Sequence, residues 1–105
     1  MAQAKKARLI PCHPKDLYPF LRRDFHASAI KAPEVFERLY SIGYYHAFKL
    51  FIGDEFMGYT CLAGFPGDKM RLMDYFAVNP ELRSKGYGKI LISELCSMAK
   101  FVSFI

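Results

Sequence analysis

The residues whose types and spacing could carry chemistry lie in one short basic turn, Arg83-Ser84-Lys85-Gly86-Tyr87-Gly88-Lys89. Its glycines let a ligand approach the backbone closely, and its arginine and lysines supply positive charge. A helix is predicted to begin at Gly88, and the first amides of a helix have no intrahelical acceptors and lie at the positive end of its dipole. This combination favours a phosphate-like anion as ligand. The alternative is an ordinary surface turn with solvated lysines.

The elements on either side of this turn follow from the hydrophobic pattern. An apolar run over residues 69–78 predicts a strand, and Asn79-Pro80 ends it because proline has no amide hydrogen to donate to a sheet. After Gly88, apolar residues recur at spacings of three and four with polar residues between them, as in an amphipathic helix. These apolar residues are Leu91, Leu95, Met98, Ala99 and Val102. The turn is therefore expected to connect a strand to a helix.

The turn and its neighbours resemble the signature of the GNAT superfamily, the acyl-CoA-dependent N-acyltransferases. That signature is Arg or Gln, two residues, Gly, one residue, and Gly or Ala, at the start of the helix after the fourth strand. Arg83, Gly86 and Gly88 occupy those positions, and residues 76–81 match the strand end that usually precedes them. The turn differs from other phosphate loops, since it contains neither a Gly-x-Gly-x-x-Gly fingerprint nor a Walker pattern.

The resemblance implies acetyl-CoA (coenzyme A) as the cofactor. In the family, the end of the fourth strand holds the pantetheine arm and polarises the thioester carbonyl, and here the matching residues are Phe76, Ala77 and Val78. The family's pyrophosphate is held by backbone amides of the turn. The matching residues here are Arg83, Ser84, Lys85, Gly86, Tyr87, Gly88 and Lys89.

The whole chain of 105 residues reads as a single α+β domain, a class often called α/β. The predicted order is a strand at residues 8–12, a helix opening at 13–16, a second helix from Pro33 to Gly43, strands at 44–52, 55–63 and 69–78, and the helix from Gly88. Short loops between the three consecutive strands predict an antiparallel meander. Residues 101–105 could start a fifth strand. Because GNAT domains normally continue beyond this point, the resemblance implies an apparently truncated domain without the C-terminal part of the fold.

Asp74 is the candidate general base. Strand alternation puts it on one face with Leu72, Phe76 and Val78, as an acid among apolar residues near the predicted cofactor. Such a carboxylate could take a proton from an attacking amine, directly or through water. The equally weighted alternative is an aspartate paired with a nearby Arg or Lys for structural reasons. The sequence indicates no metal site and no residue that protonates the departing thiolate.

Charge, cysteine content and hydropathy bear on three further classes: nucleic-acid-binding, metal-binding and membrane proteins. The formal net charge of +5 suits an acidic ligand, but most positive residues are scattered, so a nucleic-acid role is unlikely. The three cysteines have no metal-type spacing, and Cys61 is predicted to be buried in a strand. No apolar segment is long enough to span a membrane, which favours a cytoplasmic protein. An exposed sheet edge could support a homo-oligomer.

Three functional hypotheses follow. The first is an N-acetyltransferase that transfers the acetyl group of acetyl-CoA to a primary amine of a small-molecule or peptide acceptor. The second is a catalytically silent CoA-binding fragment. The third is an interaction module whose basic surface binds RNA or an acidic protein. The sequence does not identify the acceptor. By resemblance, Glu34, Glu37 and Tyr40 could contact it, although a solvated helix face explains these carboxylates more simply.

Overall fold

The computed structural model describes residues 7–65, 67–68, 71–99 and 102–104. Its element order agrees with the predicted order. The elements are β1 (Ala7–Cys12), the 3-10 turn η1 (Pro14–Leu17), α1 (Tyr18–Asp24), the 3-10 turn η2 (Ala27–Ala29), α2 (Pro33–Ser41), β2 (Tyr45–Ile52), β3 (Glu55–Ala63), β4 (Arg71–Val78), the 3-10 turn η3 (Pro80–Leu82), α3 (Tyr87–Ala99) and β5 (Val102–Phe104).

The strands form one five-stranded sheet in the order β1-β2-β3-β4-β5. The first four are antiparallel neighbours, so the predicted meander of β2, β3 and β4 is confirmed. Strand β1, which precedes the two helices in the chain, pairs with the outer edge of β2. Strand β5 runs parallel to β4 and pairs only with Arg71–Met73. Within the described part of the chain, the outer edge of β4 from Asp74 to Val78 therefore has no partner strand.

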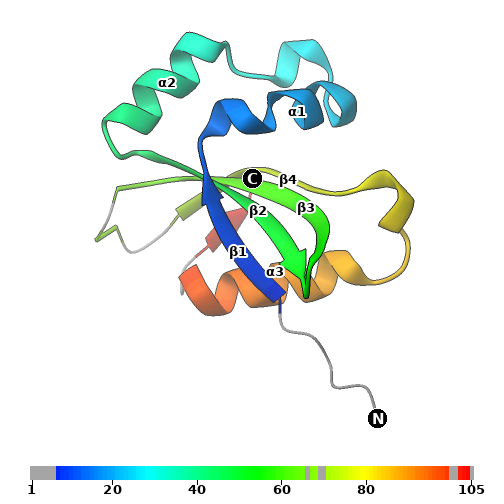
Figure 1. Cartoon of the computed structure of the whole chain (residues 1–105). Coiled ribbons are helices and arrows are strands. Elements are labelled where there is room, and N and C mark those ends of the chain that lie inside the picture. The colour runs from blue at the N-terminus through cyan, green and yellow to red at the C-terminus, as the bar shows by residue number, and fades with distance from the viewer. Residues whose placement is uncertain (1–6, 66, 69–70, 100–101, 105) are drawn as a thin grey trace.

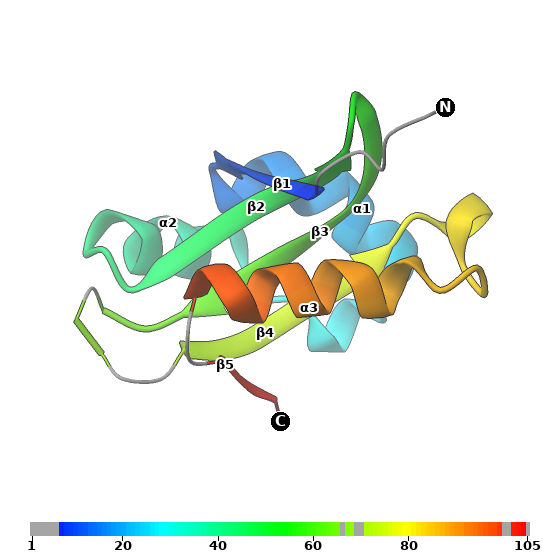
Figure 2. The ribbon, with the colours of Figure 1, turned by 90° about the horizontal axis from the view of Figure 1, so that it is seen from below.

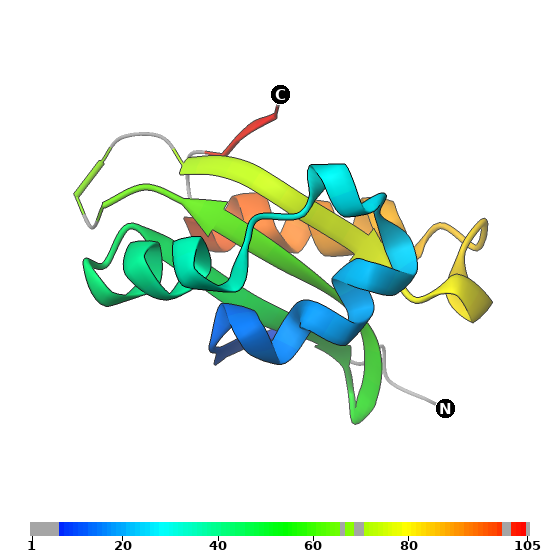
Figure 3. The ribbon, with the colours of Figure 1, turned by 90° about the horizontal axis from the view of Figure 1, so that it is seen from above.

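The sheet lies between two helical layers. Helices α1 and α2 cover one face and α3 crosses the other (Figure 1), as the views from below and above also show (Figures 2 and 3). One apolar cluster packs between the sheet and α1–α2 around Leu21, Phe36 and Tyr59. A second, around Leu50 and Leu91, packs between the sheet and α3. Burial of both faces explains why β3 carries an almost continuous apolar run.

Strands β3 and β4 approach closely at Gly58. A Cβ atom at that position would lie 2.1 Å from the carbonyl oxygen of Ala77. Only glycine fits there, since the contacted atom belongs to the backbone and cannot rotate away. Gly58 pairs with Val78, the last residue of β4, so this contact sets where β4 ends.

Three local predictions needed correction. The first predicted helix is divided into η1 and α1, with Pro19 in the first turn of α1. The segment of residues 26–30, predicted as a loop, contains η2. Val102, which fits the helical spacing, lies in β5, because α3 ends at Ala99 and a run rich in Phe and Val then pairs with β4.

Candidate functional site

The basic turn contains two residues with positive φ and leads directly into α3. Ser84 has a φ of 65° and Gly86 a φ of 86°, and α3 begins directly afterwards at Tyr87. No acceptor among the described residues bonds the amides of Ser84, Lys85 or Gly86. Lys85 is exposed, and the first turn of α3 contains no acidic residue. Unpaired amides, a helix N-terminus and exposed positive charge occur together here.

Arg83, the first residue of the turn, is held by two partners. Its Nε donates a hydrogen bond of 2.7 Å to the carbonyl oxygen of Val78, and its Nη2 donates one of 2.9 Å to Asp24 Oδ1. The side chain therefore connects the turn to the end of β4 and to the end of α1. Figure 3 shows these two ends next to each other.

A cavity of about 350 Å³ opens beside this arginine. Its lining consists of Asp24, Phe25, Phe76, Ala77, Val78 and Arg83. Of the residues predicted to bind the cofactor, the three at the end of β4 and Arg83 line this cavity. The others, residues 84–89, follow Arg83 along the chain without lining it. The cavity also lies where the edge of β4 is unpaired in the described structure.

Asp24 was missed by the sequence analysis although it lies in this cavity. Its side chain is only 3% exposed, and it accepts hydrogen bonds from Arg23, Arg83 and the Tyr59 hydroxyl. Burial alone would raise the pKa of the Asp24 carboxyl, but these hydrogen bonds outweigh burial and lower the pKa. One local signal was available, because an acidic residue at the C-terminus of a helix is disfavoured by the helix dipole.

The strand-alternation prediction puts Asp74 correctly on one face with Leu72, but wrongly with Phe76 and Val78, which pack in the cluster against α3. The β3–β4 register shifts, so that Cys61 pairs with Tyr75 while Leu62 pairs with Met73. Asp74 is therefore the extra residue of a β-bulge, which breaks the two-residue alternation.

Asp74 instead lies under the layer formed by α1 and α2. Its Oδ2 accepts a hydrogen bond from Tyr45, a core residue of that side, and forms an ion pair of 2.5 Å with Lys31 Nζ. Val78 packs in the other cluster, against α3. The ion pair that the sequence analysis left as the alternative is thus present.

The loop that carries Lys31 is fastened to the sheet. The hydroxyl of Tyr75 donates to the carbonyl of Ala29 (2.6 Å) and accepts from the amide of Lys31 (3.1 Å). The hydroxyl of Tyr18 donates to the carbonyl of Lys31 (2.5 Å). The Lys31 ammonium lies over the rings of Tyr45 and Tyr75, at 5.7 and 5.4 Å from their centroids.

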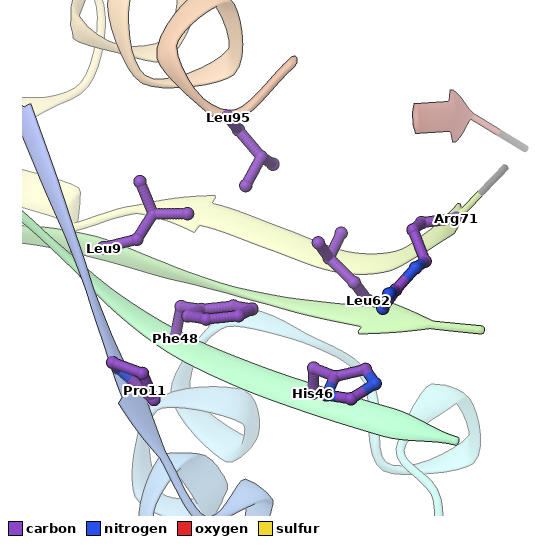
Figure 4. Close-up of a pocket in the computed structure, with 7 residues that line it drawn as sticks. All are labelled: Leu9, Pro11, His46, Phe48, Leu62, Arg71 and Leu95. Carbon is purple, nitrogen blue, oxygen red and sulfur yellow. The ribbon is translucent and has the colours of Figure 1, made fainter. Parts of the chain in front are cut away.

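A larger cavity of about 450 Å³ lies on the α3 side of the sheet (Figure 4). Its lining is Leu9, Pro11, His46, Phe48, Leu62, Arg71 and Leu95. None of these residues belongs to the predicted site. His46 and Arg71 are its two side chains that can carry charge. His46 Nε2 and Arg71 Nη1 lie 3.1 and 3.4 Å from the carbonyl oxygen of Gly64, so both already have a hydrogen-bond partner.

The other candidate groups have structural surroundings. Burial raises the pKa of the Cys61 thiol to about 12 and that of Cys12 to about 11. Glu37, one of the acceptor candidates, pairs with His13 at 2.8 Å. Among the described residues, no group of three or more His, Cys, Asp or Glu could hold a metal ion. In the same part of the chain, no helix is both long and apolar enough to cross a membrane.

Comparison with known proteins decides the family. Residues 14–103 match the model of the acetyltransferase (GNAT) family, which is most of the chain. The chain belongs to this family. No curated protein matches the sequence.

Solved structures share the GNAT fold. A GNAT-family protein from Bacteroides thetaiotaomicron is 28% identical, with a TM-score of 0.75 over 92% of this chain. A ribosomal-protein-alanine N-acetyltransferase from Brucella melitensis is 20% identical, with a TM-score of 0.59; the match covers 94% of this chain and 80% of that one. An aminoglycoside acetyltransferase from a soil metagenome, solved with sisomicin, is 16% identical, with a TM-score of 0.54 over 94% of this chain and 76% of that one. This GNAT chain spans 58% of the length of the Bacteroides protein.

Proposed function

We propose that this GNAT chain is an N-acetyltransferase that uses acetyl-CoA and a primary amine of a small molecule or peptide. The observation that carries the proposal is the cavity at the end of β4, which opens beside a turn whose amides at residues 84–86 have no acceptor among the described residues. Family membership supports acyl transfer in general. The acceptor stays open, because two structural relatives with the same fold are named for different acceptors.

The residues of the cavity and the turn fit an acyl-CoA. Its pyrophosphate would bind the amides of residues 84–89, where Lys85 and Lys89 are exposed and add positive charge. The Arg83 amide, which was predicted to join them, already donates to the carbonyl of Pro80 (3.3 Å). The pantetheine arm of the acyl-CoA would lie along Phe76, Ala77 and Val78, whose strand edge has no partner in the described structure. When bound, acetyl-CoA supplies a thioester carbonyl that an amine can attack.

Asp74 is the proposed general base. Both of its partners bind Oδ2, and Oδ1 has no hydrogen-bond partner among the described side chains. Oδ1 is therefore the atom proposed to accept the proton that the amine must lose, directly or through water.

The first test is binding of acetyl-CoA, measured by calorimetry. The double variant Arg83→Glu/Gly86→Glu should lose binding, since two carboxylates at the turn repel phosphate. Arg38→Glu/Gly43→Glu is a matched control: it makes the same change in charge, and Gly43, like Gly86, has a positive φ and open space around it. This control should bind as the wild type does. Equal affinity in both double variants would show that the turn is not the phosphate site.

The second test is release of the CoA thiol with a panel of primary amines. Asp74→Asn should keep wild-type affinity for acetyl-CoA and lower turnover by about 10²-fold or more, a usual contribution of a general base. Asp68→Asn, an exposed aspartate in the β3–β4 loop, serves as control. Turnover of Asp74→Asn equal to that of the control would remove Asp74 from the mechanism.

The alternative function is that of a catalytically silent CoA-binding fragment. One observation favours it: Asp74 is already paired with Lys31. Binding of acetyl-CoA without thiol release for any amine would select this alternative. No binding at all would reject both and leave the basic interaction module.

Self-association through the sheet edge also stays a proposal, and light scattering of the purified chain tests it.

A further inference from the structure

Asp24 is an anchoring group with no capacity left for a ligand. Its Oδ1 accepts hydrogen bonds from Arg23 Nε and Arg83 Nη2, both at 2.9 Å. Its Oδ2 accepts from Arg23 Nη2 and the Tyr59 hydroxyl, both at 2.8 Å. A carboxylate offers about four acceptor positions, and all are used here. With a side chain only 3% exposed, Asp24 is unsuited to contact an amine or to exchange protons with solvent.

The groups that Asp24 binds connect it to the turn and to the end of β4. Arg83 bridges from Asp24 to the carbonyl of Val78. Arg23 also donates to the side chain of Asn79 (3.1 Å), the residue at which the chain leaves the strand. Asn79 in turn is fixed to β3 by its side-chain and backbone bonds to Phe56 (2.8 Å) and Met57 (2.7 Å).

We infer that Asp24 is a positioning residue, which acts through Arg83 to hold the turn of residues 83–88 at the mouth of the cavity. In this way the end of α1 is coupled to the anion-binding turn. A glycine-containing turn with two positive φ values and few hydrogen bonds of its own needs such an external attachment to keep its amides convergent. The part of the inference that concerns acetyl-CoA rests on the proposed function; the part that concerns the order of the turn does not.

The first experiment measures the order of the turn in the ligand-free protein by ¹⁵N relaxation. In the wild type, the amides of residues 84–86 should have order parameters near those of rigid backbone, about 0.85, and in Asp24→Asn they should fall below about 0.6. Asp54→Asn, the same change at a fully exposed aspartate in the β2–β3 turn, should leave them unchanged. Unchanged order of the turn in a folded Asp24→Asn variant would overturn the inference.

Arg83→Gln provides a second route if Asp24→Asn does not fold. This variant removes an exposed partner and leaves Asp24 bonded to Arg23 and Tyr59, so the core attachment of α1 is retained. We expect the same fall in the order parameters of residues 84–86 and no change in those of α1. A turn that stays rigid in Arg83→Gln would overturn the inference as surely as the first result.

The second experiment measures affinity for acetyl-CoA in Asp24→Asn, Arg83→Gln and the double variant. Each single variant should weaken binding at least 10-fold, and the double variant should be little weaker than either, since both changes break one connection. Additive losses would show that Asp24 does not act through Arg83. If the wild type binds no acetyl-CoA, the proposed function fails, while the relaxation measurements still decide the positioning role.

Discussion

Replacement of Gly58 by alanine is the sharpest test of how the end of β4 is built. The new Cβ would lie 2.1 Å from the carbonyl oxygen of Ala77, whereas real Cβ atoms essentially never approach within 3.0 Å. The gap must therefore widen from 2.1 Å to at least 3.0 Å. Because the Cα of Val78 is also only 3.0 Å away, no movement of a flexible side chain can relieve the contact. Strands β3 and β4 must separate at this point.

The expected cost is about 3 kcal/mol in the free energy of unfolding. Overpacking of a rigid site typically costs about 1–3 kcal/mol, and the upper end applies here because the obstacle is backbone within a hydrogen-bonded ladder. For a domain of this size such a loss lowers Tm by roughly 10–20 °C. The same separation would displace Ala77 and Val78, which line the cavity, so we also expect weaker binding of acetyl-CoA.

Urea unfolding followed by circular dichroism measures the effect. With an m-value of about 1–3 kcal/mol per molar urea, the midpoint should fall by about 1 M or more. Gly43→Ala is the matched control, because Gly43 has a φ of 80° and nothing within 4 Å of a Cβ, so only backbone strain of about 1–2 kcal/mol applies. A Gly58→Ala variant no less stable than Gly43→Ala would refute the steric reasoning.

Two further predictions concern the turn and the buried thiol. Gly86→Ala should lower the free energy of unfolding by about 1–2 kcal/mol, because Gly86 has a positive φ. Gly88→Ala should leave it unchanged, since the new Cβ would make an ordinary 3.8 Å contact with Val78. Equal urea midpoints for the two variants would contradict this prediction. Burial raises the pKa of Cys61 from 9.0 to about 12, so the folded state holds this proton where the unfolded state releases it. The contribution of Cys61 to the free energy of unfolding should therefore be fully present below pH 9 and should be lost as the pH rises from 9 towards 12. The free energy of unfolding of Cys61→Ala should fall less steeply with pH in this range than that of the wild type. Identical slopes would show that the Cys61 thiol does not cause the decline.

The elements and the turn could be predicted because their signals are local. Apolar runs bounded by turn residues located the strands, spacings of three and four residues located α3, and Asn79-Pro80 marked the end of β4. The glycines and basic residues of the turn located it before the helix, and the structure adds that Gly86 has a positive φ. These features depend on residues close together in the chain, which a pattern can record.

The side-chain connections of the site could not be predicted in the same way. The bulge that moves Asp74 to the other face arises from pairing with β3, and no feature of β4 alone encodes it. Asp24 meets Tyr59 and Arg83 across 35 and 59 residues of sequence. A single aspartate beside two arginines in α1 gives no indication of which distant groups will reach it.

The tyrosines that fasten residues 29–31 have a consequence for how an acceptor would arrive. Lifting this segment away from both the sheet and α1 would break the two hydrogen bonds of Tyr75 and the one of Tyr18. At about 1 kcal/mol each, the lifted form would be populated well below 5% of the time. If Asp74 is the base proposed above, an amine that approaches it beside Lys31 would therefore meet a preformed surface. Its association should follow a single diffusive step whose rate rises linearly with amine concentration, with no plateau set by a gating motion.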